Sequence, residues 1–258
     1  MKLLDKSASS PTGSLLVKEG LKPLSRQQET RLAKIALNSR VIIIEGISGS
    51  GKDTLQNYLK RKLAGLNLYD YSEGEVLHSW KQLQIKGISE LRIRFMKNFV
   101  NFMSDIIHQD NHAVFLLNRF HLSTYASTIL EHPELGSQYT EIVDGLRALP
   151  VHIFILQLDE SEIEKRSFHP ERTGAWRKFQ QQIVQQHNFR ERLETQQKVI
   201  LDAAVKQGIP YSVVKLSYPR EFREGETAIP ARRVIVRPSV QIIPAKVRKR
   251  KPQLPPTV

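Results

Sequence analysis

An apolar run that ends in a glycine-rich turn constrains the fold of this chain more than any other feature. Residues 41–44 are four consecutive β-branched residues, the composition expected of a strand buried on both faces. The turn Gly46-Ile47-Ser48-Gly49-Ser50-Gly51 follows, and residues 52–63 have the apolar spacing of a helix. A strand joined to a helix by such a turn predicts the first unit of an α/β fold with a parallel sheet.

The same turn fits the pattern G-x-x-x-x-G-K, a loop that cradles phosphate groups. Glycines allow the backbone to approach phosphate oxygens, and successive N–H groups form an anion nest that the following helix N-terminus reinforces. We therefore predict a P-loop that binds ATP, with the charge of Lys52 on the β- and γ-phosphates. The predicted loop residues are Gly46, Ser48, Gly49, Ser50, Gly51, Lys52, Asp53 and Thr54.

The residue after Lys52 departs from that pattern. A P-loop usually has Ser or Thr here, whose hydroxyl holds Mg²⁺, whereas this chain has Asp53 followed by Thr54. A carboxylate is also a good oxygen ligand for Mg²⁺, so Asp53 and Thr54 are the candidate metal ligands. A negative side chain in the first turn also stabilises a helix N-terminus, and the sequence leaves both roles of Asp53 open.

Strand and helix patterns alternate along the middle of the chain. Strands are predicted at 41–44, 68–71, 113–117, 151–158 and 211–216, and helices at 26–38, 52–63, 89–108 and 179–206. Such alternation predicts a P-loop NTPase three-layer α/β/α sandwich with a five-stranded parallel sheet. The predicted units are a flexible leader with an N-terminal helix (1–39), the P-loop domain (40–218) and a basic, proline-rich tail (219–258).

The net charge of +13 is concentrated in the tail, since ten Lys/Arg and only three Glu follow residue 219. An edge strand at 233–236 is the one element expected there. A basic tail of this kind is open to three interpretations: a solvated segment, an arm that contacts nucleic-acid phosphates, or a docking segment for an acidic protein.

Two absences in the sequence narrow the class of protein. The chain has no cysteine, so disulfides and thiolate metal sites are excluded. No apolar run approaches the roughly 20 residues of a membrane helix, and residues 1–13 lack the apolar core of a secretory signal. We therefore expect no membrane association and a cytoplasmic location.

Three segments resemble the thymidylate kinase family of P-loop nucleoside and nucleotide kinases. Residues 44–54 resemble its E-G-x-x-G-x-G-K-[ST]-T pattern, and residues 118–126 (N-R-F-H-L-S-T-Y-A) resemble its D-R-Y/F-x-x-S-x-x-A segment. Residues 158–166 resemble the strand end and helix that lead into the lid of that family. The resemblance covers about 40–217 and implies ATP as donor, Mg²⁺ as metal, and a nucleoside monophosphate or nucleoside as acceptor. It also implies that Arg119 contacts substrate phosphate.

Three positions depart from the family. Ser48 replaces the aspartate that is common in the phosphate loops of thymidylate kinases. Asn118 stands where the family has an aspartate that helps to hold the metal. One hypothesis is that Asp53, at the end of the adjacent strand, supplies the missing carboxylate. The predicted helix 89–108 also lacks the usual arginine, since residues 97–99 occupy roughly its place and Arg92 and Arg94 come earlier.

Residues 166–178 form the candidate lid, because Pro170 and Gly174 interrupt their helical pattern. Phosphoryl transfer gathers negative charge on the transferred group, and cations on a closing loop would stabilise it. Arg166, Arg172 and Arg177 are therefore candidate catalytic residues together with Lys52 and Arg119. The plain alternative for the lid arginines is a solvated basic loop.

The chemistry of the acceptor distinguishes a nucleotide kinase from a nucleoside kinase. A hydroxyl acceptor benefits from a carboxylate base, for which Glu73 and Glu75 are candidates, whereas a nucleoside monophosphate needs none. We expect ATP-dependent phosphoryl transfer to a nucleoside monophosphate, with a deoxynucleoside kinase as the close alternative. The alternative from another class is a degenerate ATP-binding protein that acts through its basic tail on nucleic acid or a protein partner. The sequence leaves self-association open.

Overall fold

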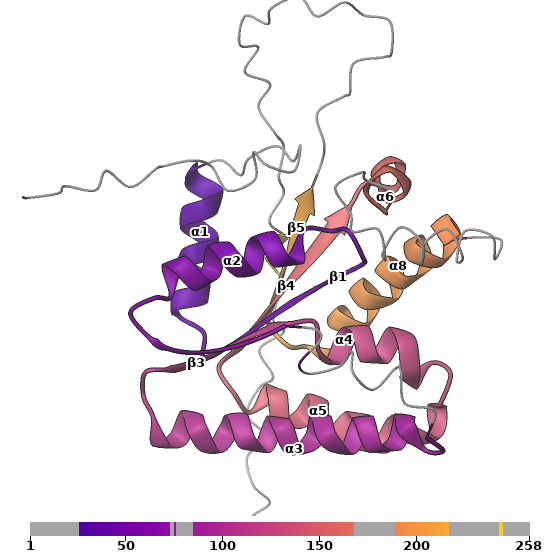
Figure 1. Ribbon diagram of the computed structural model, residues 1–258, viewed down its shortest axis with the longest axis horizontal. Coiled ribbons are helices and arrows are strands. Elements are labelled where there is room, and N and C mark those ends of the chain that lie inside the picture. The colour runs from indigo at the N-terminus through magenta and orange to yellow at the C-terminus, as the bar shows by residue number, and fades with distance from the viewer. Residues whose placement is uncertain (1–25, 73–74, 76–84, 168–188, 217–242, 245–258) are drawn as a thin grey trace, which may run out of the picture.

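Figure 1 shows the computed structural model of the chain, a sheet with helices on both faces. The structure describes residues 26–72, 75, 85–167, 189–216 and 243–244. Most of the predicted leader and tail therefore lie outside the described residues, as does the edge strand predicted at 233–236. None of the helices formed by the described residues is both long and apolar enough to cross a membrane.

The sheet has the strand order β2-β3-β1-β4-β5-β6. The strands are β1 (Val41–Gly46), β2 (Asn67–Tyr71), β3 (Ala113–Asn118), β4 (Val151–Leu158), β5 (Tyr211–Leu216) and β6 (Ile243–Pro244). Neighbours among β1 to β5 are parallel, and β6 pairs antiparallel with β5. The predicted α/β sandwich with five parallel strands is confirmed, and β6 adds a short sixth strand at the β5 edge.

The helices occupy the connections between strands. They are α1 (Arg26–Leu37), α2 (Lys52–Lys62), α3 (Ile88–Gln109), α4 (His121–Thr124), the π-helical η4 (Tyr125–Ile129), the 3₁₀ turn η5 (Pro133–Leu135), α5 (Gly136–Arg147), α6 (Glu160–Ser167) and α8 (Phe189–Gln207). The predictions for α1, α2 and α3 are confirmed to within two residues at each end. The described part of the predicted helix 179–206 begins at Phe189, and α5 is an element that the sequence patterns above do not predict.

Alternate residues of the central strands enter two separate cores. Ile42 and Ile44 pack with Leu32 of α1 and Leu59 of α2, whereas Ile43 packs on the opposite face with residues of α3, α5 and α8. Figure 1 shows this division, with α1 and α2 above the sheet and α3 and α5 below it. The period of two in a strand accounts for the split, and burial on both faces accounts for the continuous apolar runs.

The carboxyl ends of the parallel strands all lie at one edge of the sheet. At this edge, the strands that follow β1 are divided between its two sides, with β2 and β3 on one side and β4 and β5 on the other. β1 lies between β3 and β4, so the chain leaves β1 toward one side of the sheet and later crosses to the other. Ligands in open α/β sheets bind beyond the carboxyl ends of the strands at such a point. The glycine-rich turn after β1 occupies this position.

Candidate functional site

The turn after β1 has the backbone conformation that its glycines permit. Gly46, Gly49 and Gly51 have positive φ angles of 146°, 83° and 82°, which side chains disfavour. A Cβ atom on Gly46 would lie 2.7 Å from both the carbonyl oxygen of Leu156 and the Oγ of Ser50. The Oγ of Ser50 is buried and lacks a hydrogen-bond partner among the described residues. The loop is therefore wrapped tightly over the end of β4, as a phosphate cradle requires.

Lys52 opens α2 with its side chain directed back to the loop. Its Nζ donates a 2.8 Å hydrogen bond to the carbonyl oxygen of Ile47, and the residue is buried. A buried ammonium is costly unless oxygen atoms surround it. The carbonyl oxygen of Ile47 therefore holds the lysine charge against the loop. A phosphate chain bound to the N–H groups of the loop would lie close to this charge.

Glu45 joins the P-loop, the first motif, to residues 118–126, the second motif. The residue is fully buried at the end of β1, and its Oε1 accepts from the backbone N–H groups of Phe120 (2.9 Å) and Leu122 (3.1 Å). Ser123 adds its hydroxyl on Oε2 at 2.5 Å. Burial raises the pKa of Glu45, while the Ser123 hydroxyl, the Phe120 N–H and the charge of Arg119 oppose that rise. The carboxylate thus takes up the N–H groups at the start of α4 and fixes the second motif against the first.

Arg119 is held in a backbone conformation that arginine rarely adopts. Its φ is 65°, the one positive value at a non-glycine residue in the described part of the chain, and its N–H donates to the carbonyl oxygen of Ile44 at 2.8 Å. Such a conformation costs about 1–3 kcal/mol and persists only where the surroundings impose it. The contacts of Glu45 on the next residues supply that constraint.

A chain of side-chain hydrogen bonds crosses the ends of β3, α2 and β2. The Nδ2 of Asn118 donates to the Oδ1 of Asp53 (2.6 Å) and to the Oε1 of Gln56 (2.9 Å). The Nε2 of Gln56 donates to the Oδ1 of Asp70 at 2.6 Å, and Lys60 pairs with the other oxygen of Asp70. Residues 53, 56 and 60 share one face of α2. The carboxylate of Asp53 therefore meets Asn118 rather than a backbone N–H of its own helix.

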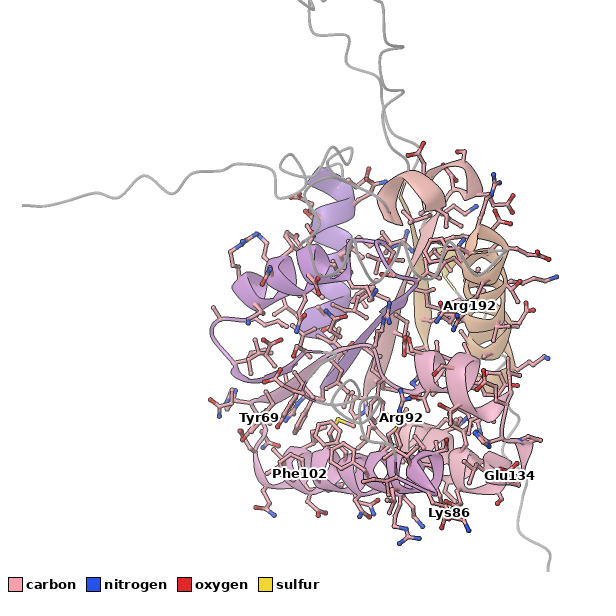
Figure 2. All side chains as sticks on the ribbon, turned by 45° about the vertical axis from the view of Figure 1, so that its right-hand side comes forward. Tyr69, Lys86, Arg92, Phe102, Glu134 and Arg192 are labelled. Carbon is pink, nitrogen blue, oxygen red and sulfur yellow. The ribbon has the colours of Figure 1, made fainter. Side chains whose placement is uncertain are left out.

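Arg92 of α3 is a buried arginine that the sequence analysis did not assign to the site. The residue is 8% exposed, and its guanidinium donates to the hydroxyls of Thr124 (3.2 Å) and Thr128 (3.5 Å). Figure 2 shows Arg92 on the sheet side of α3. It lies on the same helix face as Met96 and Phe99, and an arginine within an apolar stripe is the signal that would have identified it.

The remaining predicted residues are only partly described. Arg166 is in α6, but its side chain is outside the described residues, as are Arg172, Arg177 and Glu73. Glu75 is engaged locally, because its Oε2 accepts from both the backbone N–H and the hydroxyl of Ser72 at 2.6 Å. These two hydrogen bonds lower the pKa of Glu75. The structure thus brings together the P-loop, Arg119 and Asn118, and leaves the lid arginines as a prediction.

The donor set fits a nucleotide-bound Mg²⁺ better than a metal held by protein alone. In the described part of the chain, no group of three or more His, Cys, Asp or Glu residues is arranged to hold a metal. Mg²⁺ usually takes one or two carboxylates together with substrate phosphates and water. Asp53, exposed in the first turn of α2, is such a carboxylate. The buried Oδ1 of Asn118 beside it has no hydrogen-bond partner among the described residues.

No protein-family model matches the chain, and no curated protein matches it. Among solved structures, the chain is similar to the thymidylate kinase from Ehrlichia chaffeensis, with 20% sequence identity, a TM-score of 0.43 and coverage of 74% of this chain and 91% of that one. It is also similar to the thymidylate kinase from Candida albicans, with 14% identity, a TM-score of 0.46 and coverage of 69% and 84%. Both solved structures are thymidylate kinases, the family whose motifs the sequence resembles.

Proposed function

We propose that the chain binds ATP through the loop Gly46–Lys52 and transfers its γ-phosphoryl group to a nucleoside monophosphate. The observation that carries this proposal is the convergence of three features at the carboxyl edge of the sheet. They are a glycine-shaped loop with positive φ angles, a buried Lys52 directed at that loop, and a second motif fixed to it by Glu45. A structural turn between strand and helix requires none of these.

The residues of the loop have separable tasks. Backbone N–H groups and the N-terminus of α2 would hold the phosphate chain, and Lys52 would neutralise charge on the β- and γ-phosphates. Asp53 and Thr54 are the residues that would hold Mg²⁺, which supplies charge stabilisation to the phosphates when bound. Positioning and electrostatic stabilisation are the main contributions of a protein to phosphoryl transfer.

Two arginines, Arg119 in the second motif and Arg92 on α3, support a phosphorylated acceptor. Arg119 leaves the end of β3, and Arg92 reaches the same segment through Thr124 and Thr128. Guanidinium groups suit phosphate because their planar donors match its oxygens. In the reaction, an oxygen of the acceptor phosphate bonds to the γ-phosphorus while the bond to the leaving ADP oxygen breaks.

Glu75 is a weak candidate for the base that a hydroxyl acceptor would use. A general base must be able to take a proton at the operating pH, but the hydrogen bonds from Ser72 lower the pKa of Glu75 and weaken it as a base. An acceptor phosphate is already ionised and needs no base. The hydrogen bonds of Glu75 to Ser72 therefore do not support its use as that base.

The proposal is tested by ADP release from ATP and Mg²⁺ across a panel of nucleoside monophosphates and nucleosides. We expect stimulation by at least one monophosphate. We also expect Arg92→Lys to raise the KM for that monophosphate by about tenfold or more, the loss of one charged phosphate contact. Arg94→Lys is the matched control, since Arg94 is exposed and pairs with Glu90 on the same helix.

Other outcomes would redirect the assignment. Stimulation by nucleosides alone would favour the deoxynucleoside kinase, and tight ATP binding without stimulation by any acceptor would contradict the kinase assignment. In the second case, the basic tail would be tested next. Salt-dependent binding of nucleic acid that is lost on truncation after Ser217 would support a binding protein.

A further inference from the structure

Relative to the common P-loop arrangement, the carboxylate in this chain stands at the other of two neighbouring positions, 53 rather than 118. P-loop proteins generally hold Mg²⁺ with a hydroxyl directly after the lysine and with an aspartate elsewhere in the site. Here the position after Lys52 has the carboxylate, Asp53, and the end of the neighbouring strand β3 has an amide, Asn118. The two side chains meet, since the Nδ2 of Asn118 donates to the Oδ1 of Asp53 at 2.6 Å.

The contact holds an exposed carboxylate on a buried amide support. Asn118 is 3% exposed and Gln56 is 7% exposed, whereas Asp53 is exposed. Gln56 accepts from Asn118 and donates in turn to Asp70 of β2 and to the carbonyl oxygen of Tyr71. Each amide is therefore fixed in one orientation. Among the described residues, Asn118 is the only hydrogen-bond partner of the Asp53 carboxylate.

Capping of α2 is the simpler role for Asp53, and the geometry does not favour it. A capping side chain accepts a hydrogen bond from a backbone N–H in the first turn. The N-cap of α2 is Gly51, which has no side chain to cap the helix, and the carboxylate of Asp53 accepts a hydrogen bond from Asn118 of the neighbouring strand. The buried Oδ1 of Asn118 has no hydrogen-bond partner among the described residues, and it belongs to the side chain that holds this carboxylate.

We propose that Asp53 is the carboxylate ligand of the nucleotide-bound Mg²⁺ and that Asn118 is the positioning residue that holds it, so that the two positions form an exchanged pair. This inference rests on the proposed function. An aspartate at position 118 would place a second negative charge where Asn118 now donates, 2.6 Å from the Oδ1 of Asp53. Because like charges at that separation repel strongly, each residue type is suitable only with its present partner.

The exchanged pair predicts a specific reversal of mutational effects. Asp53→Ser removes the carboxylate, and Asn118→Asp replaces the donor with a repelling charge, so each single change is harmful. The double variant Asp53→Ser/Asn118→Asp restores the common arrangement of a hydroxyl on the loop and a carboxylate elsewhere in the site. The second change is therefore expected to destabilise the protein by itself and to restore Mn²⁺ binding after the first.

The test measures Mn²⁺ affinity by the EPR signal of the free ion, with a β,γ-methylene analogue of ATP present, in the full-length chain and its three variants. Asp53→Ser is expected to weaken Mn²⁺ binding by about tenfold or more, the effect of losing a ligand or its support. The double variant is expected to recover most of that loss. Asn118→Asp is expected to lower the thermal midpoint of the nucleotide-free protein, and Asn101→Asp, on an exposed position of α3, is the matched charge control.

The outcomes separate this inference from the proposed function. If the unaltered protein binds no Mn²⁺ in the presence of the analogue, both proposals are overturned. If the unaltered protein binds Mn²⁺ and Asp53→Ser binds it equally well, only the role of Asp53 is overturned. A double variant that is as weak as Asp53→Ser, or weaker, would overturn the exchange, while ADP release with an acceptor would still support the kinase.

Discussion

Two clusters of polar side chains differ in whether they reach solvent. The edge cluster, at the carboxyl ends of the strands, consists of Glu45, Gln56 and Asn118 with the exposed Asp53. The helical-layer cluster consists of His121, Tyr139 and Gln207, which link α4, α5 and α8. The first cluster ends in a carboxylate that reaches solvent, whereas all three members of the second are buried.

The helical-layer cluster is held by bonds between helices. The Nε2 of Gln207 donates to the Tyr139 hydroxyl at 2.8 Å, and that hydroxyl donates to the carbonyl oxygen of His121 at 3.1 Å. Arg147 adds a hydrogen bond of 2.7 Å to the carbonyl oxygen of Gln207. A groove of about 450 Å³ between η4, α5 and α8 is lined in part by Tyr139, Arg147 and Gln207, and none of the P-loop residues lines it.

The difference between the clusters distinguishes a site from a structural joint. Polar groups that join buried helices stabilise one packing arrangement and need no ligand. In the edge cluster, buried amides hold the exposed carboxylate of Asp53 beside the glycine loop, where it can contact a ligand. Changes in the edge cluster should therefore affect turnover, and changes in the helical-layer cluster should affect unfolding.

The largest effect is expected from Lys52→Ala. Loss of one charged group that stabilises the transferred phosphoryl lowers turnover by about 100- to 1000-fold. The thermal midpoint should move by no more than a few degrees, because the loop retains its glycines. Steady-state ADP release checks the prediction, with Lys62→Ala as control, since Lys62 is exposed on the same helix. Equal loss in both variants would contradict a specific role for Lys52.

The helical-layer cluster should respond to pH instead. Burial lowers the pKa of His121 from 6.5 to about 3, so the folded protein keeps this ring neutral while the unfolded chain takes up a proton below pH 6.5. Its contribution to stability is therefore complete above pH 6.5 and declines as the pH falls toward 3, by about 1.4 kcal/mol per pH unit. His152, with a pKa lowered to about 4, adds a decline of the same sign.

Urea unfolding between pH 7 and pH 5 measures this decline. His121→Asn should be less stable than the unaltered protein at pH 7, but its stability should depend less on pH in that window. The raised pKa of Glu45 acts with the opposite sign and is present in both proteins. Identical pH slopes for the two proteins would show that His121 is not the group that titrates.

The sequence was informative where the signal is local. Short runs rich in apolar and aromatic residues identified the five parallel strands, and the glycine spacing identified the phosphate loop, because both patterns depend on residues adjacent in the chain. α5 was missed, although Tyr139, Ile142, Val143 and Leu146 have helical spacing. Its Gly145 weakened the pattern for a packing reason, since a Cβ there would lie 2.8 Å from Val100 of α3.

The sequence was less informative about contacts between distant residues. Asn118 was read as a departure from a family pattern, but its role in holding Asp53 depends on a contact between residues 65 positions apart. Arg92 depends on Thr124, which is 32 positions away. Such contacts follow from how the sheet orders its strands, which local periodicity does not encode.

Tyr139→Phe tests the helical-layer cluster, and its expected effect on stability is modest. The change removes a hydroxyl that makes two buried hydrogen bonds and leaves the amide of Gln207 without its acceptor. We expect the free energy of unfolding to fall by about 1–2 kcal/mol, while kcat and KM remain unchanged. Urea unfolding and ADP release on the same preparation check both halves. A loss of turnover without a loss of stability would place this cluster in the functional site.

The smallest effect is expected at the exposed end of the edge cluster. Lys60 pairs with Asp70 at 2.5 Å, and the lysine side chain is 43% exposed. Exposed ion pairs contribute about 0–1 kcal/mol because water screens the charges and the side chains lose entropy. Lys60→Ala should therefore change the free energy of unfolding by less than about 1 kcal/mol and leave Mn²⁺ affinity unaltered, since Gln56 still holds Asp70.

Mn²⁺ titration of Lys60→Ala and Asp53→Ser, side by side, measures which members of the edge cluster contribute to metal binding. A loss in Lys60→Ala as large as that in Asp53→Ser would mean that the whole chain of hydrogen bonds, rather than the Asp53–Asn118 contact, sets the site.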